Sequence, residues 1–444
     1  MTPEQNDLLA RVEGDAPMGK LMRQHWMPAC MTEEVAEPDG TPLRVRLLGE
    51  DMVVFRDTEG RVGALDEQCP HRRASLAFGR NEECGLRCLY HGWKFDVNGD
   101  AVDMSSEPVD AKLRSTMKTK AYPVEEAGGF VWVWMGDPEQ VMPFDKPNWA
   151  TVPDSKVSIV KMHGACNWAQ VLEGSIDSAH SSSLHSSNMP TATEVSGSTA
   201  TDTAWLRPSA DKAPRLEVQK TSFGFRYVAI RKPIVDANTT DYIRMTLYVA
   251  PYTVHIPSND QYHLSQMLVP IDDENTMFYW VAWHPEKGIS SDAWRKFCGA
   301  EIGKDVEPIT FKKVRNAENN YLQDREAMKA GDFTGIYGIP TQDMAMWESM
   351  GTIADRSDDR LGSSDKAIFT FRTQMYRAAQ AVAKGEPAIG TTEPHIPQAK
   401  LMSFEGIVPK GTDWRLLNVS DEERATSQNE VTSSDTDTLK VMSA

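Results

Sequence analysis

Two short segments of the chain each combine a cysteine with a histidine, residue types that bind zinc and iron. The first is Cys69-Pro-His71, and the second, Cys88-Leu-Tyr-His91, follows after sixteen residues. A structural zinc ion and a two-iron cluster can both use such ligands. Zinc modules usually pair cysteine with cysteine along the chain, whereas each segment here mixes the two types. The mixed order favours a cluster in which the cysteines bind one iron and the histidines bind the other.

A second group of candidate ligands is Asp177-Ser-Ala-His180, followed by His185 after four intervening residues. On a helix, Asp177 and His180 would share a face, but His185 would lie about 140° away from His180. The serines at 181–183 are weak helix formers, so the helix can end or bulge there and let both imidazoles approach one ion. The alternative is a pair of histidines at a solvent-exposed helix end.

An iron centre with two histidines also needs a carboxylate, and open positions on the ion then allow oxygen to bind. Asp343, in the stretch TQDMAMWESMG, is the candidate, and Glu348 is the alternative. Asp343 also fits the N-cap of a helix over residues 343–350, which would give it a structural role only. We predict that Asp343 is the third ligand.

The elements around the cysteine–histidine segments are predicted to be short β-strands. Apolar runs separated by turn residues are typical of a small all-β domain, which we place at residues 44–137. Residues 1–43 are predicted to form a helical lead-in. The proline-rich residues 138–155 are predicted to form a linker.

The second group of ligands belongs to a larger mixed domain, predicted over residues 156–419. A helix over 165–180 precedes a series of strands, and an amphipathic helix follows over 366–384. This order predicts an α+β domain built on an antiparallel sheet. Residues 420–444 are polar and poor in aromatic side chains, and we expect them to be disordered.

Composition and charge exclude several classes of protein. With 444 residues, 40% hydrophobic and 25% charged, the chain has the composition of a globular protein of two or three domains. The net charge of −17 argues against nucleic acid as a partner, because phosphates would be repelled. No apolar run approaches the ~18 residues of a membrane-spanning helix, and the N-terminal stretch lacks the apolar region of a secretory signal. Six cysteines are too few for a disulfide scaffold, so we expect a cytoplasmic protein with free thiols and no membrane partner.

The two cysteine–histidine segments, CPHRRASL and CLYHGWKFDVNG, resemble the cluster-binding loops of Rieske domains. Followed by the pattern D-x-x-H-x-x-x-x-H, they make residues 20–400 similar to the oxygenase components of Rieske non-heme iron oxygenases. The stretches LEGSIDSAHSSSLH, NNYLQDREAMKAGDFTGI and QDMAMWESMG are most similar to the members that hydroxylate phthalate. The resemblance implies an N-terminal all-β Rieske domain and an α+β catalytic domain of the helix-grip type.

The resemblance also implies a role for each candidate ligand. A [2Fe-2S] Rieske cluster would be held by Cys69, His71, Cys88 and His91. A mononuclear Fe(II) would be held by His180, His185 and Asp343. Asp177 would link the two centres by accepting hydrogen bonds from His180 and from His91 of a neighbouring subunit. A link across a subunit interface implies a homotrimer or a hexamer of stacked trimers.

The implied activity is the cis-dihydroxylation of phthalate, or of a related aromatic carboxylate, with O2. Electrons would come from an NADH-dependent reductase through the Rieske cluster, because the chain lacks the Gly-x-Gly-x-x-Gly fingerprint of dinucleotide binding. The alternative with the same fold is an aryl O-demethylase that acts on a methoxybenzoate. Two further hypotheses are a Rieske electron carrier with a non-catalytic binding domain and a zinc-stabilised interaction protein.

A substrate with two carboxylates needs cations in its pocket, although the whole chain is acidic. Arginine is suited to this, because its planar guanidinium binds a carboxylate through two hydrogen bonds. Arg207 in AWLRP and Arg244 in DYIRMTLYV lie in apolar sequence, where a buried arginine needs an anionic partner. We predict that Arg207 and Arg244 bind the substrate, with Arg226 and Arg231 as alternatives. The alternative to substrate binding, for each arginine, is a structural role in which the guanidinium pairs with an internal acid or is exposed to solvent.

Overall fold

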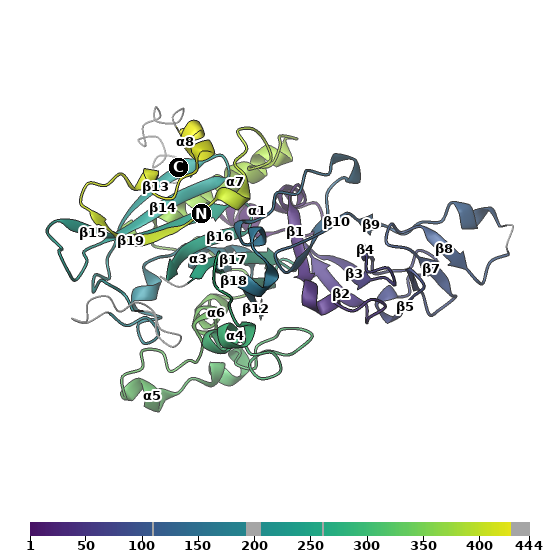
Figure 1. The fold of residues 1–444 in the computed structure, drawn as a ribbon, viewed down its shortest axis with the longest axis horizontal. Helices are drawn as coiled ribbons and strands as arrows, with labels where there is room; N and C mark the ends of the chain where they lie inside the picture. Colours follow the sequence, from purple (N-terminus) through teal and green to yellow (C-terminus); the bar gives the residue numbers. More distant parts are fainter. Residues whose placement is uncertain (109–110, 192–205, 260–261, 428–444) are drawn as a thin grey trace. The chain divides into compact units, whose positions relative to one another are not determined.

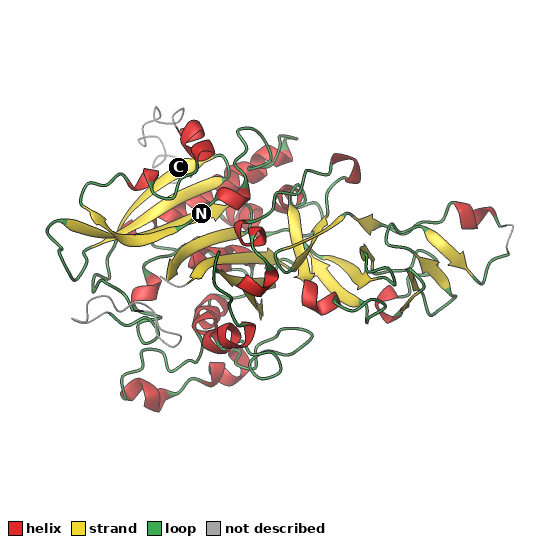
Figure 2. Cartoon of the chain, in the orientation of Figure 1, coloured by secondary structure: helices red, strands yellow, loops and turns green. Residues whose placement is uncertain are grey.

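The structure, a computed structural model, describes residues 1–108, 111–191, 206–259 and 262–427. The chain forms two compact units, one comprising Val12–Phe144 and the other Met1–Arg11 together with Asp145–Ala444. Both units contain antiparallel sheets, and in the larger unit helices also pack against the sheet, as Figures 1 and 2 show. Among the described residues, no helix combines the length and the apolar character needed to cross a bilayer.

The smaller unit contains three antiparallel sheets. The first has the order β1 (Trp26–Met31), β11 (Phe130–Trp134), β10 (Val124–Ala127). The second has the order β2 (Leu43–Leu47), β3 (Glu50–Arg56), β4 (Val62–Asp66), β9 (Ala121–Tyr122). The third has the order β5 (Arg80–Glu82), β6 (Gly85–Arg87), β7 (Trp93–Phe95), β8 (Ala101–Met104). A short helix, α2 (Pro17–Met22), precedes them.

The prediction of a helical lead-in over residues 1–43 is wrong from Trp26 onward. Helices α1 (Pro3–Ala10) and α2 are present, but residues 26–31 form β1 and pair with β11, with a shift in register between Pro28 and Cys30. This segment, WMPACM, is a short continuous apolar run that contains a proline, and nearly all of it is buried in the sheet. Such a run is typical of a buried strand and does not favour a helix. The predicted strands that follow are confirmed, beginning with the hairpin of β2 and β3.

The larger unit is built on one eight-stranded antiparallel sheet. Its order is β12 (Val157–Gly164), β18 (Thr276–Trp283), β17 (Tyr262–Pro270), β16 (Thr253–Asn259), β15 (Thr240–Val249), β14 (Gly224–Arg231), β13 (Arg215–Thr221). The last strand of the chain, β19 (Phe404–Pro409), pairs with the N-terminal half of β15, whereas β16 pairs with its C-terminal half. The α+β class predicted for this part of the chain is confirmed.

Helices accompany this sheet, and one of them carries Asp343, a candidate ligand of the second group. They are α1, α3 (Trp168–Ser175), α4 (Ser291–Cys298), α5 (Arg325–Lys329), α6 (Ile339–Ser349), α7 (Lys366–Ala383) and α8 (Asp421–Ser427). The long helix α7 buries Phe371, whose ring meets those of Trp168 in α3 and Tyr248 in β15 at 5.8 and 5.4 Å between centroids. Burying one such side chain contributes about 1.5–3 kcal/mol, so α7 holds α3 against the sheet.

Two predicted boundaries in the larger unit are wrong. The helix expected over residues 165–180 ends at Ser175, since Asp177 begins a turn in which its carboxylate accepts a hydrogen bond from the Ala179 N–H at 2.8 Å. Disorder was expected from residue 420, but residues 421–427 form α8, whose Glu423 is buried beside Arg226. The rest of that expected tail, residues 428–444, lies outside the described residues.

Candidate metal centres

The two cysteine–histidine segments form a pair of loops with the same backbone geometry. Cys69 and Cys88 are both buried, and each carbonyl accepts a hydrogen bond from the amide four residues later, at 2.9 Å from Arg73 and 3.0 Å from Gly92. Arg73 and Gly92 both have left-handed conformations, with φ of 62° and 74°. At Gly92 the left-handed backbone favours glycine, and a Cβ there would lie 2.2 Å from Ser105 Oγ, so the serine side chain would have to move. The loops therefore present their ligands in equivalent ways.

Within these loops the side chains come together in two like pairs. The rings of His71 and His91 lie 4.3 Å apart between centroids. Burial raises the pKa of the Cys69 thiol to about 11, and the neighbouring Cys88 adds to that rise. Neither cysteine is in a disulfide. A thiol pair beside an imidazole pair fits a Rieske cluster, in which each iron takes one of the two pairs, and does not fit the order of a zinc module.

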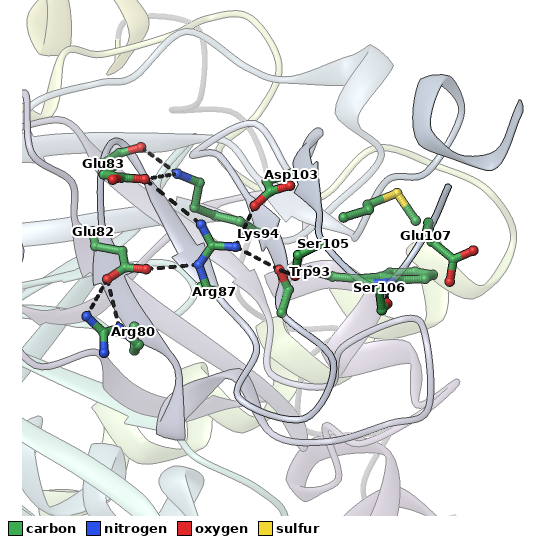
Figure 3. Close-up of polar contacts among 12 residues, drawn as sticks. Arg80, Glu82, Glu83, Arg87, Trp93, Lys94, Asp103, Ser105, Ser106 and Glu107 are labelled. Carbon is green, nitrogen blue, oxygen red and sulfur yellow. Dashed lines mark hydrogen bonds and ion pairs between the residues drawn. The ribbon is translucent and has the colours of Figure 1, made fainter. Parts of the chain in front are cut away.

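A polar network fixes the second loop (Figure 3). The guanidinium of Arg87, the residue before Cys88, donates to the carboxylates of Glu82 and Asp103 at 2.9 and 2.7 Å and to the carbonyl of Gly92 at 2.9 Å. Trp93 stacks on the His71 ring, with 4.3 Å between centroids and 8° between planes. Trp93 therefore covers one face of the His71 ring.

The second group of ligands converges in the larger unit. The Nε2 atoms of His180 and His185 lie 3.2 Å apart, and the Asp343 Oδ1 lies 3.4 and 3.0 Å from them. Each of the three side chains offers a ligand atom within 4.8 Å of the other two, so together they could hold a single metal ion. Asp343 Oδ1 is buried without a well-directed hydrogen bond, although two imidazole nitrogens are close. Lone pairs that face a common point in this way fit a two-histidine, one-carboxylate iron site.

Two helices and a turn position these ligands. His180 opens a short 3₁₀ segment (His180–Ser182) after α3, and Asp343 is the fifth residue of α6, whose N-cap is Gly338. The alternative role of Asp343 as an N-cap is therefore excluded. Helices α3 and α6 pack closely, since a Cβ on Gly174 would lie 2.0 Å from Trp347 Nε1. This contact sets the separation between Asp343 and the turn that carries His180 and His185, which we call the histidine turn.

Glu348, the alternative carboxylate ligand, serves a structural ion pair instead. Its Oε1 accepts hydrogen bonds from Lys313 Nζ at 2.6 Å and from the Ala165 N–H at 2.9 Å. Its Oε2 accepts a hydrogen bond from the Tyr321 hydroxyl at 2.5 Å. Lys313 and Glu348 are both almost completely buried, so both oxygens are committed away from the histidines.

The protonation of His185 is set by a residue that sequence reasoning missed. Gln342 Oε1 accepts a hydrogen bond from His185 Nδ1 at 2.8 Å. The amide NH2 of Gln342 donates to Asn188 Oδ1 and to the Ile336 carbonyl, both at 2.9 Å, so the amide oxygen must face the imidazole. The proton of the neutral ring therefore stays on Nδ1, and Nε2 keeps the lone pair that a metal needs.

Asp177 lies behind the other histidine. Its Oδ2 is 3.7 Å from His180 Nδ1, which is an ion-pair distance and longer than a hydrogen bond. Burial opposes ionisation of Asp177, but the interaction with His180 outweighs it and lowers the pKa of the carboxyl. The expected contact with His180 is thus present as an electrostatic pairing.

A cavity adjoins the three convergent ligands. It is lined by polar and apolar side chains of α3, the histidine turn, the sheet and α6: Gly174, Ser175, Asp177, Ser178, His180, Ser181, His185, Met189, Tyr227, Arg244, Thr246, Ile256, Pro257, Gln266, Trp280, Ile339, Asp343 and Trp347. Arg244 is the one arginine in this lining. Its guanidinium reaches the Pro257 carbonyl at 3.4 Å and Glu405 at 3.8 Å.

The other candidate arginines have different surroundings. Arg207 and Arg231 lie close enough to Arg244 for the positive charges to interact, but their guanidinium groups bind backbone and serine oxygens of residues 178–189. Burial, and then repulsion by Arg244 and Arg231, lowers the pKa of Arg207 to about 10. Arg226 lies instead beside Gln219 and Glu423. Of the two predicted substrate arginines, the structure thus places Arg244 in the cavity wall and Arg207 beside it.

Two further polar residues in the lining, Gln266 and Trp280, were not predicted. The available signal was a glutamine inside the apolar run LSQMLVP, since a polar side chain within a buried strand breaks the local pattern. Gln342 gave no signal, because its role depends on the loops that it joins.

Comparison with known proteins identifies the class of protein that this fold and these sites define. Residues 25–120 match the Rieske [2Fe-2S] domain model, and residues 133–438 match the model described as LigXa C-terminal domain like. The chain belongs to the family of Rieske oxygenase subunits. Its cofactors are a Rieske [2Fe-2S] cluster and a mononuclear iron.

Individual relatives show which Rieske oxygenases the chain is similar to. The chain is 56% identical to the phthalate 4,5-dioxygenase oxygenase subunit of Pseudomonas putida, over 94% of each chain. It is 31% identical to the 5,5'-dehydrodivanillate O-demethylase oxygenase subunit of Sphingobium sp. (strain NBRC 103272 / SYK-6), covering 87% of this chain and 82% of that one. The structure of dicamba monooxygenase bound to dicamba shares the fold, with a TM-score of 0.57 at 18% identity, over 82% of this chain and 99% of the other.

Proposed function

We propose that this protein is the terminal oxygenase subunit of an enzyme that cis-dihydroxylates phthalate. The observation that carries the proposal is the position of Arg244, a buried cation in the wall of the cavity where His180, His185 and Asp343 converge. A cation beside a candidate iron site suits an aromatic substrate that carries carboxylates. The relative at 56% identity, a phthalate 4,5-dioxygenase oxygenase subunit, supports the same substrate.

The candidate ligands divide between the two cofactors. We assign Cys69, His71, Cys88 and His91 to the [2Fe-2S] cluster. We assign His180, His185 and Asp343 to Fe(II), which when bound supplies the site at which dioxygen is activated. Gln342 keeps the proton of His185 on Nδ1, away from the metal side. Both oxygen atoms enter the ring, and the accompanying two electrons and two protons come from NADH and solvent.

Substrate orientation follows from the charges around the cavity. Arg244 binds one carboxylate of phthalate, in competition with its contact to Glu405. Arg207 and Arg231 add positive potential at the same end, and Arg207 reaches the second carboxylate if it gives up a backbone hydrogen bond. This arrangement directs the unsubstituted edge of the ring toward the histidine turn.

The electron supply and the assembly belong to the same proposal. An NADH-dependent reductase delivers electrons to the Rieske cluster, and Asp177 links His180 to His91 of a neighbouring subunit in a homotrimer or a hexamer of stacked trimers. Support comes from the placement of Asp177 behind His180 and from the exposure of Leu89 and Tyr90 next to His91. The free thiols of all six cysteines suit a cytoplasmic enzyme.

The test is a single turnover of anaerobically reduced protein with isotopically labelled dioxygen. Phthalate, terephthalate and a methoxybenzoate are offered in parallel. A phthalate cis-diol that carries both labelled atoms supports the proposal. Formaldehyde from the methoxybenzoate, with phthalate unchanged, overturns it in favour of an O-demethylase.

A further inference from the structure

Gln266 and Trp280 form a polar pair in the cavity wall that the proposed reaction does not use. They lie directly opposite each other on β17 and β18. Both side chains are buried, with 6% and 2% of their surface exposed, and both line the cavity. Gln266 Oε1 and Trp280 Nε1 have no hydrogen-bond partner in the described part of the chain. Buried polar atoms without partners are costly in a native protein, and their position suggests that a bound molecule supplies the missing hydrogen bonds.

The register of the sheet shows that this pair lies at a distance from Arg244. Gln266 is opposite Val254 on β16, and Val254 is opposite Tyr248 on β15. Tyr248 lies four residues beyond Arg244 on the same strand. At ~3.4 Å per residue and ~4.8 Å between strands, the backbone of Gln266 lies about 14 Å along the sheet and about 10 Å across it from Arg244. The cavity therefore has a cationic end at Arg244 and a neutral polar end at Gln266 and Trp280.

The chemistry of the neutral end selects one kind of group. The indole N–H of Trp280 can only donate a hydrogen bond, and the amide oxygen of Gln266 can only accept one. A hydroxyl group satisfies both atoms at once, because it accepts and donates. A methyl group satisfies neither atom, and a carboxylate cannot donate to the amide oxygen.

We propose that Gln266 and Trp280 form a hydroxyl subsite, so that the protein binds a ring-hydroxylated aromatic acid more tightly than an otherwise similar acid without the hydroxyl. The acid group lies at Arg244, and the hydroxyl group lies between the amide oxygen and the indole nitrogen. This inference rests on the proposed function only for the identity of the acid.

The experiment compares the dissociation constants of 4-hydroxyphthalate and 4-methylphthalate for the holoenzyme, measured by calorimetry without reductant. The two ligands have similar size and charge, so their ratio isolates the hydroxyl group. In the wild type we expect 4-hydroxyphthalate to bind about tenfold more tightly, the size of one well-made hydrogen-bonded contact. Gln266→Met and Trp280→Phe each reduce the ratio to about twofold or less. Ile256→Val, at an apolar position of the same cavity, is the matched control and keeps the tenfold ratio.

Each possible outcome decides the matter. A wild-type ratio near one overturns the hydroxyl subsite, and so does a tenfold ratio that persists in both variants. Circular dichroism confirms that each variant is folded, because the Rieske cluster lies in the other unit of the chain and its spectrum does not report on this sheet. Either variant alone is sufficient. If phthalate itself neither binds nor reacts while the ratio is as expected, the proposed function fails and the subsite remains.

Discussion

Gln342 offers the sharpest test of how this protein controls its iron site. Gln342→Leu removes the acceptor for His185 Nδ1 while keeping a side chain of similar size. The imidazole then loses the hydrogen bond that fixes its tautomer and its orientation. Removal of an outer-shell partner typically costs 10–100-fold in metal affinity, or about 1.4–2.8 kcal/mol. We expect the dissociation constant for Fe(II) to rise by that factor.

The same substitution also lowers stability, and this must be separated from the effect on iron. The His185 N–H and the Ile336 carbonyl are both buried and both lose a partner, and each unsatisfied group costs about 1–3 kcal/mol. Gln342→Glu is the matched control, because a carboxylate can still accept from His185 but can no longer donate to Asn188 and Ile336. It should destabilise the protein while iron affinity stays at or above the wild-type value.

The assay is competition for Fe(II) between the protein and a chelator of known affinity. The absorbance of the Rieske cluster reports the amount of protein in each sample independently of the iron site, since the cluster lies in the other unit of the chain. Circular dichroism reports whether the larger unit is folded. Wild-type iron affinity in Gln342→Leu would refute the reasoning. Equal losses of Fe(II) affinity in the leucine and glutamate variants would also refute it, because both variants lack the amide N–H donors and only the leucine variant lacks the acceptor for His185.

Three other predictions concern single residues. Asp177→Asn should retain both metals and lose most turnover, because the charge behind His180 is gone; turnover near the wild-type rate contradicts the linking role. Glu348→Gln should lower the free energy of unfolding by about 3–5 kcal/mol by leaving Lys313 buried without its anion, yet iron should still bind at wild-type stoichiometry by metal analysis. Burial raises the pKa of Glu50, but hydrogen bonds from Lys120 and Arg23 prevail and lower it from 4.5 to about 2. The stability that Glu50 contributes is therefore complete above pH 4.5 and is lost as the pH falls toward 2. The difference in melting temperature between wild type and Glu50→Gln should shrink over that interval, and a constant difference would exclude this role.

Short-range patterns in the sequence were sufficient to predict most of the fold and the residue types of the candidate ligands. The cysteine–histidine loops, the hairpin of β2 and β3 and the long helix α7 are specified by short-range patterns, and each was predicted. The end of the helix before the histidine turn was predicted at the wrong residue. The prediction relied on the serines at 181–183, but α3 ends before Asp177, whose carboxylate accepts a hydrogen bond from the Ala179 amide.

What the sequence did not reveal depends on long-range pairing. Glu348 resembled a second ligand because it lies five residues after Asp343, and only the approach of Lys313 from a distant loop shows its structural role. Gln342 gains its function from Asn188 and Ile336, which belong to separate segments. No local pattern encodes such a meeting, since each residue is ordinary in its own helix or loop.

Strand β15 pairs with β19 along one half and with β16 along the other, so the amino acids at the two ends of the cavity can be substituted independently. Strand β15 leaves β19 near Met245 and joins β16 from Leu247 onward, and Arg244 lies on the β19 side of that point, opposite Glu405. Glu405 belongs to a C-terminal strand that carries none of the proposed iron ligands, so substitutions there would change the charge beside Arg244, the proposed carboxylate site, without touching those ligands. A family with this architecture can therefore diversify in the acids it accepts while its oxygen chemistry stays constant.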